Sequence, residues 1–558
     1  MHLTKNVCVT LLGFLDVYGK SKDTLNARLD LEELKVRNRL HPESRGSGKH
    51  WLHPASYTLS KLEKKTMMQC LSSTKVPSGY SSNVKRLVNM KEKKIVGLKS
   101  HDCHVLMTQL LPVAVRGILP KNVRGTIIKL CSWFNAISQK VIDPEKLLKL
   151  QSDVVDCLVS LEMIFPPSFF NIMTHLMVHI VTQIEILGPS FLHNMFPFER
   201  FMAILKKYVR NRSRPEGCIA NGYGTEEVIE FFVDYVPDLK AIGVPESRHE
   251  GRLKGRGTLG RKPDSSHDGA TFKKAHFTVL EQSSLVRPYF EEHLDMLRSE
   301  NPKKPEGWIF RAHKEQFGYW FQKLMMSTTV TEPNALKLEQ LRRLSRGPSS
   351  TVVKYKGYEI NGFTFYTRAQ DEKSTNQNSG VRIDALNDEG QKITYYGIIE
   401  EIWEMDYGPL KVPLFRCQWV KNNKGAVDID EFGMTSVDLN KIGFEDDPFV
   451  LAKDVTQVFY VPDMASISPP AKKRKRADKT SDHPTRHVVL QGKQRIVGVE
   501  DVTDKTGEEE YNQFEEIPPF AVDVDISILQ CEGDQDPSIR TDHNEGILVK
   551  TVVVQKNA

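Results

Sequence analysis

The sequence predicts a multidomain α+β protein with a helical N-terminal half, a small antiparallel β domain and a disordered C-terminal tail. Apolar residues recur at helical spacing between about 100 and 240, and they alternate at strand spacing from about 352 onward. After Met464 the chain becomes polar and is broken by prolines, a composition typical of disorder. The length of 558 residues exceeds what one core normally spans, which indicates several domains.

Start and stop signals place the helices of the N-terminal half. A short helix is expected near 59–71. Asp143 followed by Pro144 is a typical helix start, with Ser168 as the cap of the next helix and Gly188 as its end. We expect residues 1–95 to form one unit and residues 96–246 to form a helical domain.

The second half of the chain is expected to contain four segments. Residues 247–275 are rich in glycine and basic residues and indicate a linker, and residues 276–346 indicate a helical segment. Residues 350–465 predict about six short antiparallel strands in a barrel or sandwich, with hairpin turns at Asn361-Gly362 and at 422–425. The predicted disordered tail covers residues 466–558.

Charge is distributed unevenly along the chain. Residues 481–558 hold 7 Lys and Arg against 16 Asp and Glu, a net charge of −9. Because the whole chain carries +6, residues 1–480 carry +15. A basic body with an acidic tail is typical of a polyanion-binding protein whose tail competes with the ligand, although the same charges also serve solubility.

The cysteines and the apolar runs give indications of the cellular compartment of the protein. Eight scattered cysteines without a CxxC motif predict free thiols in a reducing environment. The longest apolar run is interrupted by His175, His179 and Glu185, so we expect no membrane span. The N-terminal 23 residues lack a small-residue cleavage site and are not expected to be a signal peptide.

Two histidines on an apolar helix are the first candidate site. His175 and His179 are four residues apart, a spacing that lets two imidazoles share one zinc ion. Zinc needs about four ligands, and His101, Cys103 and His104 offer the remainder. The alternative is a pair of core histidines that are hydrogen-bonded to their neighbours.

Glu199 is the second candidate, because it lies among three phenylalanines in FPFERF. A carboxylate in such surroundings is expensive to bury unless it is paired or bound to a metal. The alternative is a partly exposed acid at a helix start, where it favours the helix dipole.

Basic runs indicate nucleic-acid binding. The first run follows Glu199 and the second lies in the predicted linker; their residues are Lys206, Lys207, Arg210, Arg212 and Arg214, then Arg252, Lys254 and Arg256. Such strips neutralise phosphates, although a solvated helix face has the same composition. A third run has the form of a nuclear localisation signal: Lys472, Lys473, Arg474, Lys475 and Arg476.

The helical half resembles the plant CACTA (En/Spm-type) DNA transposases. The matching strings include LKSHDCHVLMTQLLPVAVRGILPKNVR, LEMIFPPSFFNIMTHLMVH, FPFERFM and LKKYVRNRSRPEGCIANGY, and together such strings cover residues 1 to about 275. The β region resembles the second domain of unknown function that accompanies these transposases, through YEINGFTFYT, VPLFRCQW and PFVLAKDVTQVFYV.

The resemblance implies a remnant of a ribonuclease-H-like nuclease with a helical insertion, in which three carboxylates hold two divalent ions. The group is also similar to the antigen-receptor recombinase, where a zinc-binding histidine pair precedes the last catalytic acid. On that analogy His175 and His179 match the zinc ligands and Glu199 matches the last acid. The first two acids are expected before Met1, and Thr4 replaces an acid of the related MHxEKNV string.

These observations predict a truncated, transposon-derived nuclear protein that binds DNA and does not cleave strands alone. Zinc is the expected structural metal, and Mg²⁺ is expected only if another chain completes the site. One alternative is a protein-interaction module in which the β domain acts through Trp403 and Trp419. Another is a subunit that supplies Glu199 in trans to a transposase, and self-association is a further possibility.

Overall fold

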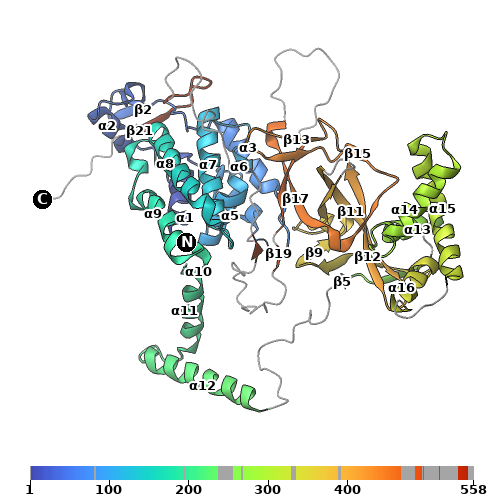
Figure 1. Cartoon of the computed structure of the whole chain (residues 1–558). Helices are drawn as coiled ribbons and strands as arrows, with labels where there is room; N and C mark the ends of the chain where they lie inside the picture. Colours follow the sequence, from blue (N-terminus) through green and yellow to red (C-terminus); the bar gives the residue numbers. More distant parts are fainter. Residues whose placement is uncertain are drawn as a thin grey trace.

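The computed structural model describes residues 2–78, 80, 83–193, 195–236, 255–265, 268–328, 335–386, 391–466, 484–492, 494–495, 514–515 and 538–550. Its main parts follow one another from left to right in Figure 1: a helical body, a large antiparallel sheet and a layer of four helices. The predicted fold class is therefore confirmed, with helices in the N-terminal half and antiparallel strands in the C-terminal half.

The helical body is built around one hydrophobic cluster that runs from Val7 to Ile184 and so crosses the predicted boundary at residue 95. Its helices are α1 (His2–Phe14), α2 (Leu25–Glu33), α3 (Lys61–Ser73), α4 (Val84–Leu87), α5 (Ser100–Val105), α6 (Leu111–Ala114), α7 (Lys121–Ile137), α8 (Leu147–Ile164) and α9 (Ile172–Leu187), with a π-helical turn at Leu106–Leu110. Because α1 packs on both α5 and α9, residues 1–95 belong to this core.

Local signals explain where the body's helices begin and end. Ser60 and Glu63 form a capping box at the start of α3, and Asp143 accepts a hydrogen bond from the Glu145 N–H before α8. The predicted cap at Ser168 is wrong, because Ser168 lies in a 3₁₀ turn and Asn171 caps α9.

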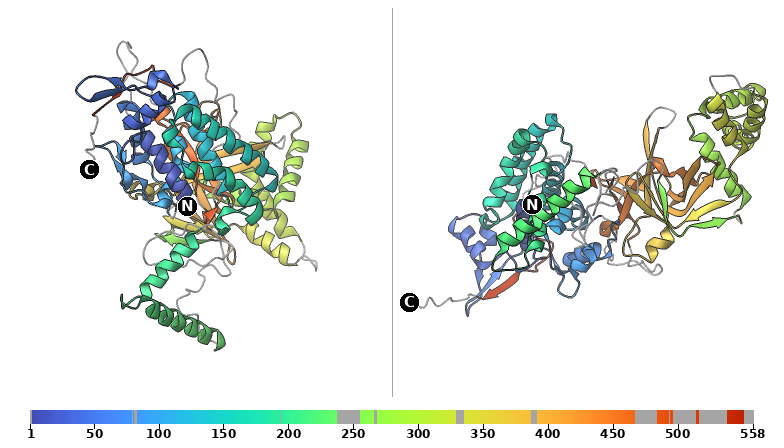
Figure 2. Two further views of the ribbon diagram at one scale, coloured as in Figure 1. Left: turned by 90° about the vertical axis from the view of Figure 1, so that its left-hand side faces the viewer. Right: turned by 90° about the horizontal axis from the view of Figure 1, so that it is seen from below.

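Two further helices leave the body as an arm, defined here as α11 (Phe196–Tyr208) and α12 (Pro215–Tyr235). The short helix α10 (Ser190–His193) connects α9 to them. The arm projects away from the body in both Figure 1 and Figure 2, and α12 runs across the end of α11. The arm helices contact each other, but neither contributes a residue to the body's core cluster.

The sheet has eleven antiparallel strands, more than the six predicted. The strands of its main path are, in spatial order, β13 (Val427–Ile429), β14 (Thr435–Val437), β18 (His487–Gln491), β17 (Thr456–Pro462), β10 (Gly380–Leu386), β11 (Lys392–Asp406), β12 (Lys411–Val420) and β15 (Ile442–Gly443). Strands β6 (Lys262–Asp264), β7 (Val352–Tyr355) and β16 (Phe449–Leu451) pair off this path.

One predicted hairpin is confirmed and the other is wrong. Asn361 and Gly362 both have positive φ, and they join β8 (Gly357–Ile360) to β9 (Phe363–Tyr366) through a two-residue turn. Residues 422–425 instead connect β12 to β13, which do not pair with each other. β8 and β9 form a separate sheet with β5 (Arg256–Leu259), and α17 (Arg368–Glu372) follows β9.

The prediction of a linker over 247–275 is wrong for its described part. β5 pairs with β8 and β6 pairs with β7, so residues 256–264 belong to the β region. The helical layer then begins with α13 (Gly269–Glu281) and continues with α14 (Arg287–Glu300), α15 (Glu306–Ser327) and α16 (Ala335–Arg346). These helices share a hydrophobic cluster with Trp403 and Met405 of β11.

Two segments of the predicted tail are ordered. β18 lies between β14 and β17 inside the sheet, and its Val488 and Leu490 join the core of the helical body. Residues 538–550 return to the body, where β21 (Ile547–Lys550) pairs with β2 (Lys49–Leu52), which in turn pairs with β1 (Glu43–Ser44). The predicted disorder therefore does not extend over these two segments.

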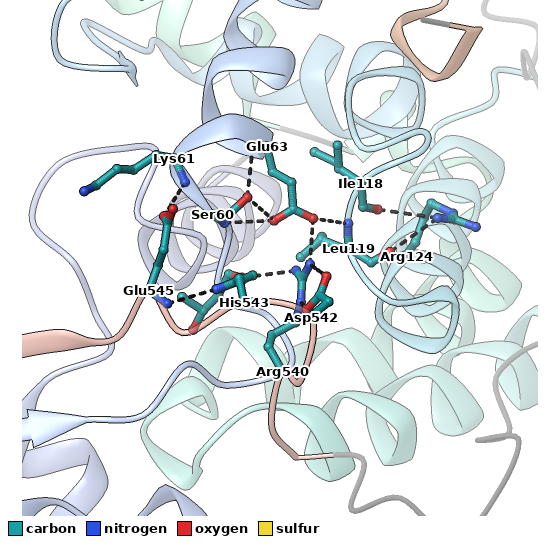
Figure 3. Close-up of polar contacts among 11 residues, drawn as sticks. Ser60, Lys61, Glu63, Ile118, Leu119, Arg124, Arg540, Asp542, His543 and Glu545 are labelled. Atoms are coloured by element: carbon teal, nitrogen blue, oxygen red, sulfur yellow. Dashed lines mark hydrogen bonds and ion pairs between the residues drawn. The ribbon is translucent and has the colours of Figure 1, made fainter. Parts of the chain in front are cut away.

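Polar contacts fix residues 538–550 on the body (Figure 3). Arg540 donates from Nη2 to Glu63 Oε1 at 2.8 Å, and the N–H of Lys61 donates to Glu545 Oε2 at 2.6 Å. Glu63 also accepts from the N–H of Leu119 at 3.0 Å, so one carboxylate joins three segments of the chain.

Candidate nucleic-acid interface

The first run of cations predicted to bind nucleic acid lies at the bend of the arm, between α11 and α12. Lys206 and Lys207 occupy the last turn of α11, and Arg210, Arg212 and Arg214 follow in the connection to α12. All five residues are exposed. We refer to residues 206–214 as the basic turn.

The backbone of the basic turn is closed by local hydrogen bonds. Asn211 caps the turn by accepting from the N–H of Ser213 at 3.0 Å through its side chain and from the N–H of Arg214 at 3.2 Å through its carbonyl. The Cys218 thiol donates to the carbonyl of Asn211 at 3.8 Å. Pro215 then starts α12 in the first turn, where its missing N–H costs nothing.

A tyrosine holds the two helices of the arm together. A Cβ on Gly222 would lie 2.5 Å from the Tyr208 ring, so this mid-helix glycine permits the close approach of α11 and α12. The Tyr208 hydroxyl donates to Glu226, and this hydrogen bond raises the pKa of Tyr208 to about 12. Phe201 packs edge-on against Tyr223, with ring centroids 6.1 Å apart. The basic turn therefore joins two helices that are braced against each other.

Arg256 does not belong to this surface. Its guanidinium is 2.8 Å from Glu359 across the β5–β8 pair, and the side chain is mostly buried. Its charge is neutralised within the sheet, which corrects its assignment as a DNA contact. Arg252, Lys254 and the localisation run Lys472 to Arg476 lie outside the described residues.

Glu199 is not the buried acid that its aromatic neighbours suggested. Its side chain is 51% exposed in the first turn of α11, and its carboxylate lies 3.6 Å from His2 Nε2 on α1. The neighbouring Phe198 is also exposed, because this part of α11 lies outside the body's core. Glu199 is therefore a partly exposed acid at a helix start, as in the second of the two interpretations of the sequence.

His175 and His179 are neighbours on the exposed side of α9. Their Nε2 atoms are 3.2 Å apart, and the helix buries its opposite face through Met177, Val181 and Ile184. They are therefore not core histidines.

The residues expected to complete the zinc site lie on α5. Cys103 is buried and hydrogen-bonded with Cys8 of α1, and this contact, together with burial, raises the pKa of Cys8 well above its ordinary value. His104 is also buried. Across the described ranges, no three His, Cys, Asp or Glu side chains are grouped closely enough to hold a metal ion. The structure thus does not bring the five predicted ligands together.

The two tryptophans proposed as anchors for protein partners are core residues. Trp403 is buried against Phe449, with ring centroids 5.0 Å apart, and donates from Nε1 to Glu401 at 2.8 Å. Trp419 lies on β12 and is buried in a hydrophobic cluster of the β region. Neither offers a contact surface to a partner.

Sequence reasoning missed the bracing of the arm and the docked segment 538–550. A glycine inside a helix was the only signal for the Tyr208 contact. The seven cysteines among the described residues are free thiols, as predicted. Within those same residues, none of the helices has the length and apolar character needed to cross a bilayer.

Comparison with known proteins identifies two domains. Residues 137–249 match the domain of unknown function DUF4218, and residues 403–468 match the domain of unknown function DUF4216. Both domains are typical of plant transposase-derived proteins. No curated protein and no solved structure is similar enough to match the chain. The first match includes α9, the arm and the basic turn, whereas the second begins within β11 and ends after β17.

Proposed function

We propose that this chain is a transposon-derived protein of the CACTA group that binds duplex DNA in the nucleus and does not cleave strands on its own. The observation that carries the proposal is the basic turn. It places five cations within nine residues, all exposed, at the bend between the two helices of an arm that stands away from the body.

The geometry of the basic turn suits phosphate contacts. A turn on a projecting arm can approach a duplex without the body clashing, and long Lys and Arg side chains reach several phosphates from one turn. Each neutralised phosphate releases counterions, so binding through five cations depends steeply on salt. The fixed positions of the two braced helices keep the cations together, which lowers the entropy cost of binding.

The CACTA assignment is supported by the two domain matches and by the strings that resemble this family. The proposed nuclear localisation rests on the basic run at 472–476.

The surroundings of Glu199 support the absence of autonomous cleavage. Two-metal hydrolysis needs several carboxylates within a few ångströms to hold the ions and position the phosphate. The side chain beside Glu199 is that of His2, and among the described residues no group of three His, Cys, Asp or Glu side chains could hold a metal ion. A partly exposed single carboxylate supplies neither the bridging ligand nor the flanking ligands.

The test is a salt titration of binding by the full chain to a fluorescent duplex of about 30 base pairs. If all five cations contact phosphates, the logarithm of the affinity should fall with the logarithm of salt concentration with a slope of about −4.5. Measurable binding at low salt with that slope supports the proposal. A flat dependence, or no binding at 50 mM salt, contradicts it.

A further inference from the structure

Helix α12 carries an apolar stripe that nothing in the described chain covers. Val228, Phe231, Phe232 and Tyr235 follow the i, i+3, i+4, i+7 pattern of one helix face, and they are 68%, 72%, 58% and 76% exposed. This face points away from α11, which contacts the opposite side through Gly222 and Glu226. Isolated exposed apolar residues are ordinary, but four on one face indicate an interaction surface.

The same stripe continues toward the N-terminus of α12 with small or polar residues. Its positions there are Gly217, Asn221 and Gly224. A Cβ on either glycine would meet nothing within 4 Å, so neither is explained by packing inside the chain. Glycines inside a helix cost about 1 kcal/mol each relative to alanine. One face of α12 thus has a shallow half and a bulky half.

We propose that this face binds a second copy of the chain, with the two α12 helices packed antiparallel around a twofold axis near residue 226. In that register Tyr235 lies over the partner's Gly217, Phe231 over the partner's Asn221 and Val228 over the partner's Gly224. Each bulky half fills the shallow half of the other copy. A twofold axis repeats every contact, as an isologous interface requires.

Charge favours the same orientation. The basic turn immediately precedes α12, at the positive end of its helix dipole. Antiparallel packing brings the cations of one copy beside the C-terminal end of the other copy's α12, which is the negative end of that helix dipole. A parallel arrangement would place the two basic turns against each other.

The area is adequate for a specific contact. The four exposed side chains present roughly 500 Å² per copy, judged from the usual size of aromatic residues. Two copies thus approach the ~1,000 Å² that a biological interface normally exceeds. This inference is independent of the proposed DNA binding.

The test is the oligomeric state of the full chain, freed of nucleic acid by nuclease treatment and measured by sedimentation velocity between about 1 and 100 μM, a range set by the weak affinities of small interfaces. We expect a concentration-dependent dimer. The double variant Phe231→Gln/Tyr235→Gln should weaken dimerisation at least about tenfold, which is the loss of one or two interface contacts. Because both side chains are exposed, the variant should fold normally.

Two further variants make the test specific. Phe310→Gln/Tyr319→Gln removes exposed aromatic residues from α15, where Tyr319 is also 76% exposed, and should leave the dimer unchanged. Gly224→Leu should strengthen the helix yet weaken the dimer, because the new side chain occupies the space of the partner's Val228. A wild-type chain that stays monomeric, or a dimer that survives both α12 variants, overturns the proposal. Since no DNA is present, neither result bears on the basic turn.

Discussion

Arg540 and Glu63 form an ion pair at 2.8 Å although 477 residues separate them in sequence. Burial opposes ionisation of Glu63, but the Arg540 guanidinium and the N–H groups of Leu119 and Ser60 outweigh it and lower the pKa of Glu63 below its ordinary value. The pair closes residues 538–550 onto the helical body, beside the β2–β21 ladder (Figure 3). Residues 538–550 are therefore part of the N-terminal fold.

Removing this ion pair should release the docked segment. Arg540→Ala leaves a mostly buried carboxylate without its partner, so we expect local stability to fall by about 2 kcal/mol, the usual value for a hydrogen bond to a charged group. Hydrogen exchange of the amides of β21 and β2 measures the effect. Arg45→Ala, which breaks an exposed pair with Glu43, should change stability by about 0.5 kcal/mol or less. Equal exchange in both variants would show that Arg540 does not hold the segment.

The helical layer should lose stability in mild acid. His293 and His313 are buried, and their Nδ1 atoms are 2.8 Å apart, so one ring donates and the other accepts. Burial lowers the pKa of His293, and burial together with His293 lowers the pKa of His313 to about 4. Between pH 4 and the ordinary value of 6.5, the unfolded chain therefore binds more protons than the native protein. Stability should be full above pH 6.5 and fall as the pH decreases toward 4.

Hydrogen exchange of α15 at pH 7.5 and pH 5 measures this dependence. Burial also lowers the pKa of His276 to about 4, so the double variant His293→Leu/His313→Leu should reduce the pH dependence without abolishing it. The exposed His179→Gln should leave it unchanged. A pH dependence that is identical in wild type and double variant would contradict the assignment.

Two glycines of α12 should respond in opposite ways to alanine. In Gly222→Ala the new methyl group meets the Tyr208 ring, so the arm should loosen and lose about 1–3 kcal/mol of local stability. In Gly224→Ala the methyl group enters open space, and the helix should gain up to about 1 kcal/mol. The exchange rates of α12 amides distinguish the two. Destabilisation of equal size at both positions would show that α11 does not pack against Gly222.

The histidine pair of α9 should not be needed for folding. His175 and His179 are exposed, and no third ligand group adjoins them among the residues with described positions. His175→Gln should therefore change the melting temperature by less than about 2 °C, the range of ordinary surface substitutions. Melting curves with and without a chelator provide the control. A large loss of stability in either experiment would revive the predicted structural zinc site.

Features that depend on neighbouring residues were predictable from the sequence. The turn at Asn361-Gly362 needs only two residues that accept positive φ, and Gly188 ends α9 for a similar reason. The exposure of Glu199 was not predictable, because apolar neighbours indicate burial only if the helix packs on a core. Here α11 leaves the body, so the same residues are exposed.

Contacts between distant segments gave no local signal. Arg256 looked like one cation in a basic linker, but Glu359 neutralises it 103 residues later in the chain. The three predicted zinc ligands of α5 were linked to the histidine pair of α9 only by residue type, and the structure does not bring the two groups together. A partner across a sheet or a core cannot be read from spacing along the sequence.

The most direct test of the central claim compares three forms of the full chain in the salt titration of duplex binding. Lys206→Gln/Arg210→Gln/Arg212→Gln removes three cations from the basic turn, and Lys20→Gln/Lys65→Gln/Lys91→Gln removes three exposed cations from the body. We predict that the first variant binds more weakly and that its salt slope is shallower by about 3, whereas the second behaves like wild type. Equal slopes in all three forms would contradict the assignment of the basic turn as the DNA-binding surface.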